Sequence, residues 1–284
     1  MAVYFVTGKL GAGKSLAAIQ RIRDYAANGN KIAGNLDVYL DKLCTNPRSK
    51  VSYIRIPDRP TAADLYALGE GKPSDDYDEE HNGLLVLDEL VTWLNSRSWN
   101  DKGRKDLIDW FVHARKFGWD IIFLVQSIEA VDKQLIDTLM EYHVPVINLS
   151  KINIPVIGRL YKHFNTKGKP LRLPKVHIAH VMYLDKISAD RWTFRAMDLY
   201  AAYDTKQVIS ENYPHGPHSQ LSRWHLEGRY LPPENNLQWR DVLILPAALL
   251  IYAACRLFQH PVPVRSGRFE SGSAGLRRLG GSAA

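Results

Sequence analysis

The sequence predicts an α/β fold in which a parallel β-sheet carries helices on both faces. A short β-branched and aromatic run at Val3 to Thr7 is followed by a glycine-rich loop and then by a stretch with helical apolar spacing. Two further apolar runs begin at Gly83 and at Asp120, and both end in polar side chains. Uninterrupted apolar runs of this kind are typical of parallel strands that are buried on both faces.

The loop after the first strand has the spacing G-x-x-x-x-G-K-[ST] of a P-loop, which binds nucleotide phosphates. Its residues are Gly8, Lys9, Leu10, Gly11, Ala12, Gly13, Lys14 and Ser15. Glycines let backbone N–H groups face the phosphates from conformations that a Cβ atom would obstruct. Lys14 is expected to contact the β and γ phosphates of ATP, and the Ser15 hydroxyl is expected to bind Mg²⁺. ATP and Mg²⁺ are therefore the predicted cofactors.

Between the P-loop and residue 82, the apolar spacing predicts a long helix, two strands and a short helix. These elements are the helix Ser15–Tyr25, the strands Lys31–Leu36 and Val51–Ile56, and the helix Asp64–Leu68. Gly29 is expected to end the first helix, because glycine readily adopts the left-handed conformation that closes helices. The acidic, glycine-rich stretch 69–82 is predicted to be a surface loop.

The apolar run at Gly83–Leu87 ends in two acids, Asp88 and Glu89. In open α/β sheets, ligands bind where the parallel strands end. Asp88 is therefore expected to hold Mg²⁺ through its water shell, and Glu89 to orient and deprotonate the attacking water. An apolar run that ends in two acids is a weak signal alone, but a P-loop in the same domain strengthens it.

A helix is predicted to start at Leu90, and Leu107–Phe117 is predicted to be another helix, with Gly118 as its end. The strand Asp120–Ser127 follows and finishes in Gln126. Many P-loop ATPases place a polar residue here that contacts the γ-phosphate, so Gln126 is the predicted sensor of hydrolysis. The alternative is an exposed amide beside a helix cap.

Beyond residue 127 the pattern predicts one more helix, one more strand and a β-hairpin. These elements are Ile128–Leu139, Tyr142–Leu149 and the hairpin strands Val176–Leu184 and Arg191–Met197, with the basic linker Lys151–Lys175 before the hairpin. The hairpin is predicted to be a small β appendage of the core. His177 and His180 on its first strand should point to opposite faces, so they make a poor metal pair.

The C-terminal part of the chain has a different composition. Residues 211–241 are rich in Pro, Gly, His and Asn and are predicted to tether the domain 1–210 to the apolar segment Val242–Phe258. That segment has 17 residues with one charge, so it predicts a single transmembrane helix near the lower limit of length. The alternative is a buried or interfacial helix. The Gly-, Ser- and Arg-rich residues 259–284 are predicted to be disordered.

Composition and charge limit the possible classes of protein. The chain has 284 residues, 45% of them hydrophobic, which is enough for one large domain or two smaller ones. Residues 1–150 carry 18 basic and 21 acidic side chains, whereas residues 151–240 carry 14 and 7. This asymmetry points toward an acidic partner, either nucleic acid or an anionic membrane surface, and the alternative is a solvated basic face. Cys44 and Cys255 are too few and too far apart to suggest a disulfide framework or a metal cluster, and no cleaved signal peptide is expected.

The order of these motifs resembles the zonula occludens toxin (Zot-like) family, the assembly ATPases of filamentous bacteriophages. The resemblance covers roughly residues 1–210 and includes the N-terminal P-loop, the Leu-Leu-Val-Leu-Asp-Glu strand, the His-Ala-Arg-Lys-Phe-Gly-Trp-Asp-Ile junction, the Gln126 strand end and the late apolar segment. It implies a RecA-like motor of the FtsK/HerA class, with the roles of Gly8–Ser15, Asp88, Glu89 and Gln126 carried over. The tail after the apolar segment, 26 residues, is shorter than a periplasmic domain.

The resemblance also implies partners and a location. Such motors are anchored in the host inner membrane with the ATPase domain in the cytoplasm, and they form ring-like homo-oligomers. The implied partners are membrane lipid and the coat or ssDNA-packaging proteins of the virion, with direct nucleic-acid contact left open. An arginine from a neighbouring subunit is expected to complete the site, with Arg115 as first choice and Arg97 and Arg104 behind it.

Two other functions stay open. Lys9 lies five residues before Lys14, as does the signature lysine of ParA/MinD-like dimeric switches, although Glu89 argues against that class. The fold could also serve as the scaffold of a non-hydrolysing toxin or interaction protein. Steady ATP hydrolysis separates these alternatives.

Overall fold

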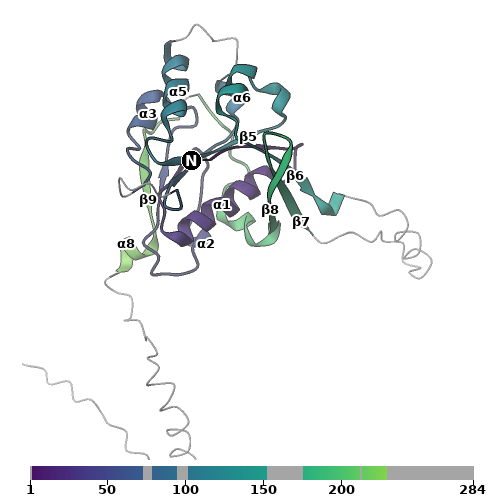
Figure 1. Cartoon of the computed structure of the whole chain (residues 1–284). Helices are drawn as coiled ribbons and strands as arrows, with labels where there is room; N and C mark the ends of the chain where they lie inside the picture. The colour runs from purple at the N-terminus through teal and green to yellow at the C-terminus, as the bar shows by residue number, and fades with distance from the viewer. Residues whose placement is uncertain (1, 73–78, 95–101, 152–174, 212, 229–284) are drawn as a thin grey trace, which may run out of the picture. The chain divides into compact units, whose positions relative to one another are not determined.

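The computed structural model describes residues 2–72, 79–94, 102–151, 175–211 and 213–228, shown in colour in Figure 1. Within these residues, nine strands form one sheet in the order β8-β7-β6-β1-β5-β4-β2-β3-β9. The residues belong to one compact unit, which extends over Met1–Leu231.

The middle of the sheet is parallel, as the sequence predicts. Its strands in spatial order are β6 (Tyr142–Asn148), β1 (Val3–Thr7), β5 (Trp119–Val125), β4 (Gly83–Leu87), β2 (Ile32–Gly34) and β3 (Ser52–Arg55). Every side chain of β4 and β5 is buried, because helices cover both faces. Since all six strands run the same way, the polar residues at their ends gather on one edge.

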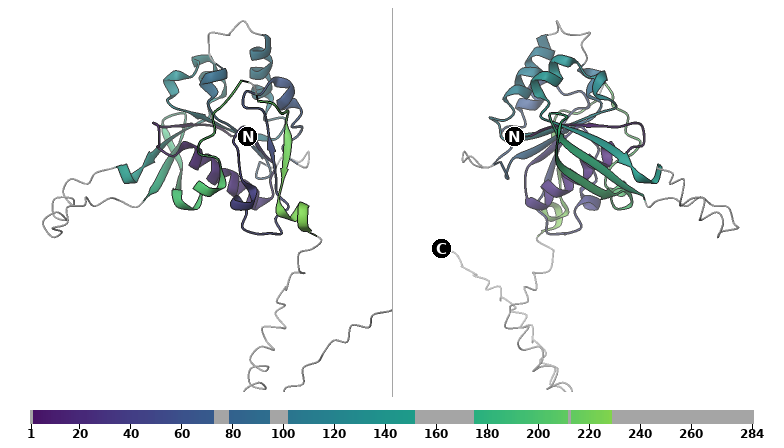
Figure 2. Two further views of the ribbon diagram at one scale, coloured as in Figure 1. Left: turned by 180° about the vertical axis from the view of Figure 1, so that it is seen from behind. Right: turned by 45° about the vertical axis from the view of Figure 1, so that its right-hand side comes forward.

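Antiparallel strands complete the sheet on both sides. The hairpin β7 (Val176–Tyr183) and β8 (Ile187–Arg195) continues the sheet beyond β6 in the right-hand view of Figure 2. The predicted hairpin is therefore present, but it is part of the main sheet and not a small appendage of the core. The reason is that β7 pairs with the free edge of β6, a partner that alternation within the hairpin cannot specify.

The opposite edge also differs from the prediction. Residues 211–241, expected as a tether, include β9 (His218–Leu221), which pairs antiparallel with β3, and the helix α8 (Arg223–Glu227). Most side chains of β9 are exposed, so its sequence lacks the apolar alternation of a strand. Its place in the sheet comes from backbone pairing with the edge of β3. The folded unit thus extends past residue 210.

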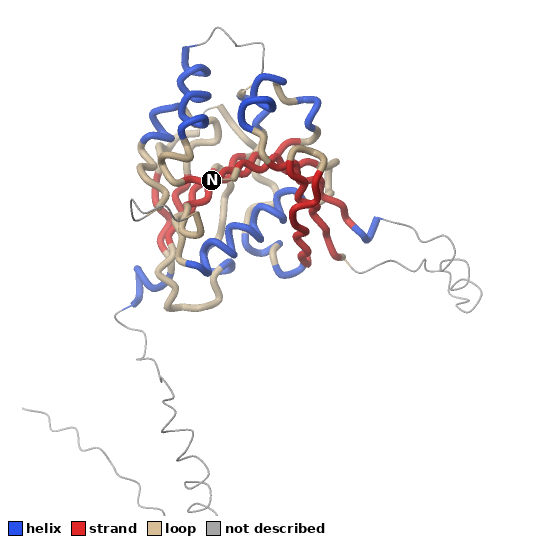
Figure 3. The backbone as a smooth tube through the Cα atoms, in the orientation of Figure 1, coloured by secondary structure: helices blue, strands red, loops and turns tan. Residues whose placement is uncertain are grey.

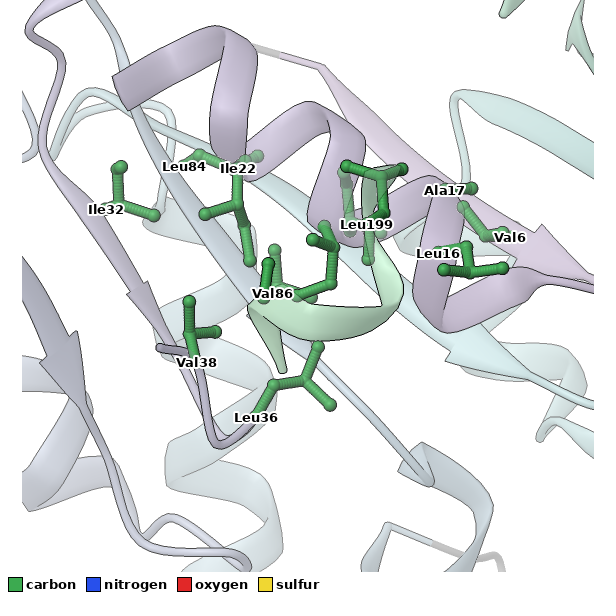
Figure 4. Packing of buried hydrophobic residues seen from close by; sticks show 14 of the residues in the cluster. Val6, Leu16, Ala17, Ile22, Ile32, Leu36, Val38, Leu84, Val86 and Leu199 are labelled. Carbon is green, nitrogen blue, oxygen red and sulfur yellow. The ribbon is translucent and has the colours of Figure 1, made fainter. Parts of the chain in front are cut away.

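Helices cover both faces of the sheet, as predicted (Figures 1 and 3). One face carries α1 (Lys14–Asn28) and α2 (Leu40–Leu43); the other carries α3 (Ala62–Tyr66), α5 (Lys102–His113) and α6 (Lys133–Leu139). Leu16 and Ile22 of α1 belong to the same apolar cluster as Val86 of β4 and Leu199, which comes from a much later segment (Figure 4). Alternate residues of β1 enter the two apolar clusters, Val6 on the α1 face and Phe5 on the other.

Some boundaries differ from the predicted ones. The expected helix Ile128–Leu139 is broken into a 3-10 turn, Ile128–Ala130, and α6, because Asp132 caps α6 by accepting a hydrogen bond from the Gln134 amide at 3.0 Å. The segment Leu90–Trp93 forms the short helix α4. The predicted span Val242–Phe258 and tail lie outside the described residues. Within the described part, none of the helices is long and apolar enough to cross a membrane.

Candidate nucleotide site

A cavity of about 660 Å³ lies at the edge where the parallel strands end. Its lining includes most of the predicted site residues. These are Leu10, Gly11, Gly13, Lys14 and Ser15 from the P-loop, Asp88 and Glu89 after β4, and Gln126 after β5. The structure thus brings together side chains from three separate segments, as the sequence predicts. Gly8, Lys9 and Ala12 complete the loop, with Lys9 exposed and Ala12 buried.

The P-loop runs from β1 into α1 and is held by its own hydrogen bonds. The Lys14 ammonium donates to the Gly8 carbonyl oxygen at 2.9 Å, and the Ala12 amide donates to the Lys9 carbonyl oxygen at 2.9 Å. Gly13 caps α1 with φ 103°, a left-handed conformation that favours glycine. Burial lowers the pKa of Lys14, and the nearby Asp88 carboxylate opposes this shift. The loop therefore presents a partly desolvated cation and a helix N-terminus to the cavity.

The chain turns sharply after β4. Glu89 has φ 53° and ψ 38°, a left-handed conformation that costs a residue with a side chain roughly 1 kcal/mol or more. The Glu89 amide donates to Asp88 Oδ1 at 2.7 Å, and the Thr92 amide and hydroxyl both donate to the Glu89 carbonyl oxygen at 2.9 Å. This turn leaves Asp88 half-buried and Glu89 exposed, with both lining the cavity.

The Asp88 carboxyl is in an environment that disfavours its charge. Burial is the main cause that raises its pKa, from 3.8 to about 6, and the neighbouring Glu89 carboxylate adds to the effect. Lys14 and a hydrogen bond with the Ser15 side chain oppose the shift. A hydroxyl and a carboxylate are the hard oxygen donors that Mg²⁺ takes in nucleotide sites. The Ser15 hydroxyl and the Asp88 carboxylate therefore have the chemistry to hold a magnesium ion. The raised pKa of Asp88 also fits a nearby cation, because a positive charge would stabilise the ionised carboxylate.

Gln126 lies directly beside the start of the P-loop. Its carbonyl oxygen accepts a hydrogen bond from the Gly8 amide at 3.3 Å, and its side chain is exposed and lines the cavity. The end of β5 and the P-loop are thus fixed relative to each other.

The three candidate arginines lie in different environments. Arg104 is 6% exposed and pairs with Asp132 at 2.5 Å, which ties α5 to the cap of α6. Arg115 lies in the turn before β5, at the edge opposite the cavity, and its largely exposed guanidinium approaches Glu79 at 3.5 Å. Arg97 lies outside the described residues. Within its own chain, Arg115 is therefore placed away from the nucleotide cavity.

His177 is a site residue that the sequence does not indicate. It is 2% exposed, its Nδ1 lies 2.7 Å from the Ala12 carbonyl oxygen, and its ring stacks on Phe194 with centroids 5.4 Å apart. A Cβ atom on Gly13 would lie 2.4 Å from the same nitrogen. Alternation along β7 places His177 on the buried face, but its contact with the P-loop depends on pairing between β7 and β6.

Residues 199–211, here called the crossing segment, also reach the cavity. They lie between β8 and β9 in the sequence, which are strands on opposite edges of the sheet, and they make hydrogen bonds with residues just after β2. The Tyr39 amide donates to the Ala202 carbonyl oxygen at 2.8 Å, and the Asp204 amide donates to the Asp37 carbonyl oxygen at 2.9 Å. The crossing segment contributes Tyr200, Tyr203 and Thr205 to the cavity lining. Burial raises the pKa of Tyr203 to about 12, and the Tyr200 and Asp88 charges add to the shift.

Comparison with known proteins identifies the family. A family model described as zonular occludens toxin (Zot) matches residues 2–203. The chain belongs to the Zot family. The resemblance inferred from the order of the motifs is therefore confirmed.

This Zot-family chain has relatives in several phages. It is 48% identical over 244 residues to the Gene 1 protein of Enterobacteria phage M13, a match that spans 83% of this chain and 68% of the relative. It is 42% identical over 275 residues to the Gene 1 protein of Salmonella phage IKe, with 91% of this chain and 74% of the relative covered. The chain is thus a homologue of the Gene 1 proteins of filamentous phages.

Two solved structures show weaker likeness. The N-terminal domain of zonular occludens toxin from Neisseria meningitidis has a TM-score of 0.39 and 17% identity, covering 72% of this chain and 98% of that domain. B204, the DNA-packaging ATPase from Sulfolobus Turreted Icosahedral Virus, has a TM-score of 0.38 and 13% identity, covering 68% and 97%.

Proposed function

We propose that this chain is an ATP hydrolase of the Zot family. One observation carries the proposal: Lys14 and Ser15, Asp88 and Glu89, and Gln126 arrive from three segments at one cavity. Phosphoryl transfer needs a phosphate cradle, a metal ion and a group that orients water, and these side chains have the chemistry for each part.

In this proposal each residue has a separate role. The P-loop backbone and Lys14 bind the phosphates, and Ser15 and Asp88 hold Mg²⁺. When bound, that ion would neutralise charge on the phosphates. Glu89 orients and deprotonates the attacking water, since it is exposed in the cavity next to the metal ligand. Gln126 senses the γ-phosphate.

The biological role follows from the family. We propose that hydrolysis drives assembly and export of a filamentous phage across the bacterial inner membrane. The chain would be anchored once by Val242–Phe258, with the domain that contains the cavity in the cytoplasm. Its partners would be membrane lipid and the coat or ssDNA-packaging proteins of the virion. Homology to Gene 1 proteins supports this role, and the basic excess in residues 151–240 fits acidic partners, including nucleic acid.

A ring-like homo-oligomer would complete the site. No arginine stands among the described residues that line the cavity. Arg104 is buried in its pair with Asp132, whereas Arg115 is largely exposed on the opposite edge of the sheet. An exposed arginine far from its own cavity can act on the cavity of a neighbouring copy, so we keep Arg115 as the leading candidate in trans.

The test is steady ATP hydrolysis by the purified full chain in detergent with Mg²⁺, compared with Lys14→Ala. Hydrolysis that depends on Glu89 supports the proposal. Nucleotide-dependent dimerisation that requires Lys9, with no effect of Glu89→Gln, would instead indicate a ParA/MinD-like switch. Nucleotide binding without turnover would indicate a non-hydrolysing scaffold.

A further inference from the structure

A chain of hydrogen bonds links the backbone of Asp88 to the crossing segment. We propose that Asn35 and Gln207 are positioning residues for the Asp88–Glu89 pair, and that Gln207 couples the crossing segment to these carboxylates. This inference rests on the proposed hydrolysis, because it assigns the link to the same site.

The Asn35 side chain binds both backbone polar groups of Asp88, the N–H and the C=O. The Asp88 amide donates to Asn35 Oδ1 at 2.7 Å, and Asn35 Nδ2 donates to the Asp88 carbonyl oxygen at 3.1 Å. The strand pairing between β2 and β4 ends at Gly34 and Val86. The backbone N–H and C=O of Asp88 lie beyond that last pair, so the Asn35 side chain supplies their hydrogen-bond partners. Asn35 is 0% exposed, and its Nδ2 also donates to the Asp58 carbonyl oxygen at 3.0 Å. Its amide therefore has one fixed orientation.

These hydrogen bonds between Asn35 and Asp88 lie just before the turn between β4 and α4. Glu89, the next residue, has the left-handed φ of 53° that turns the chain from β4 into α4. A strained conformation persists only where the surroundings fix it. By fixing the Asp88 peptide, Asn35 sets both where the turn occurs and where the two carboxylates lie in the cavity.

Gln207 holds Asn35 in turn. Gln207 Nε2 donates to the Asn35 carbonyl oxygen at 2.8 Å, and the Asp37 amide donates to Gln207 Oε1 at 2.7 Å. Both polar ends of the Gln207 side chain are thus used on the backbone just after β2. The two segments are 170 or more residues apart in sequence, so this contact exists only when the crossing segment is in place.

The crossing segment is anchored on one side of Gln207 and meets the cavity on the other. Beyond Gln207, the Ser210 amide donates to Asp58 Oδ2 at 2.9 Å, and Asp58 is paired at 2.5 Å with Arg55, which is 1% exposed. Before Gln207, Tyr203 and Thr205 line the cavity. A nucleotide that contacts those two residues would therefore affect the position of Gln207. Through the hydrogen bonds of Gln207 it would also affect the positions of Asn35 and Asp88.

The decisive variant is Gln207→Met, which keeps the side-chain length and removes both hydrogen bonds. Loss of a residue that orients catalytic groups typically lowers activity about 10-fold or more. We expect that fall in kcat with little change in the Kd of a fluorescent ATP analogue, because the P-loop contacts remain. Lys206→Met is the matched control, since the Lys206 side chain is exposed on the same segment. Asn35→Ser is a second variant, and it should lower kcat further.

A second readout does not need hydrolysis. Backbone hydrogen exchange in residues 33–40 and 204–211 of the full chain should slow when MgATP is added, and this protection should be lost in Gln207→Met but kept in Lys206→Met. Parental kcat and parental protection in Gln207→Met would overturn the inference. A parental chain that binds ATP without turnover would contradict the proposed function, and the exchange result alone would then decide the inference.

Discussion

The Nδ1 atom of His177 lies 2.7 Å from the carbonyl oxygen of Ala12, in the middle of the P-loop. A carbonyl oxygen only accepts hydrogen bonds, so this nitrogen donates and the tautomer of His177 is assigned from its partner. The two residues are 165 positions apart in sequence. The P-loop is therefore supported by a strand that lies much later in the sequence.

Replacing His177 should weaken both nucleotide binding and stability. His177→Ala removes the donor to the Ala12 carbonyl and leaves a space beside Gly13, and an unsatisfied buried acceptor costs roughly 1–3 kcal/mol. We expect a lower unfolding temperature and a nucleotide Kd raised about 5-fold or more. His180→Ala on the opposite face of β7 is the control. A His177→Ala chain that binds ATP as tightly as the control would show that the contact does not support the loop.

Lys14→Ala and Glu89→Gln should separate nucleotide binding from hydrolysis. Lys14 contacts phosphate in the ground state and in the transition state, whereas Glu89 acts on water only in the chemical step. Lys14→Ala should lose affinity, and Glu89→Gln should keep affinity and lose turnover. Equilibrium binding of a fluorescent analogue and single-turnover hydrolysis measure the two effects. Parental turnover in Glu89→Gln would exclude this residue as the base.

Asp88→Asn should stabilise the protein when Mg²⁺ and nucleotide are absent. The pKa of Asp88 is raised to about 6 in the folded state, so the folded chain binds more protons than the unfolded chain between about pH 4 and 6. Stability therefore falls as pH rises through this window, and the full cost of the ionised carboxylate is present at pH 7. Removing that charge should add about 1–2 kcal/mol at pH 7.5 and little at pH 4.

Thermal unfolding in EDTA at both pH values measures this effect. Asp106→Asn, at an exposed position of α5, is the control for loss of a surface charge. An Asp88→Asn chain that is less stable than the parent at pH 7.5 would contradict the assigned direction.

Two truncations test where the folded unit ends. A chain ending at Leu231 keeps β9 and the contact of the Arg55 guanidinium with the Tyr213 ring at 4.5 Å, whereas a chain ending at Ser210 loses both. The longer fragment should bind nucleotide like the full chain and leave carbonate-washed membranes, if Val242–Phe258 is the anchor. The shorter one should be less stable by roughly 1–3 kcal/mol in chemical unfolding. Equal stability of both fragments would show that β9 adds nothing to the unit.

Mixing two inactive variants tests the role of Arg115 in trans. Arg115→Ala and Lys14→Ala should each hydrolyse ATP poorly, because related arginines contribute on the order of 10³-fold or more. Their mixture should recover activity, since some shared sites would combine an intact P-loop with an intact arginine. Arg104→Ala should lower stability instead, because Arg104 pairs with Asp132 inside one chain. Full activity of Arg115→Ala alone would remove it as the candidate.

The sequence by itself determined the parts of this protein that depend on neighbouring residues. The P-loop, the buried run before Asp88 and Glu89, and the strand that ends in Gln126 are local patterns, and the parallel sheet brings their ends to one edge. The family followed from the order of the same motifs. Such signals lie within short windows, so they can be recognised without knowing which strand pairs with which.

Only the tertiary structure decided how that edge is supported. His177 reaches Ala12 because β7 pairs with β6, and Gln207 reaches Asn35 because the crossing segment spans the sheet. β9 joins β3 through backbone hydrogen bonds, and these bonds do not depend on which side chains the strand carries. In each case the partner is chosen by contacts between segments far apart in sequence, and no local periodicity records that choice.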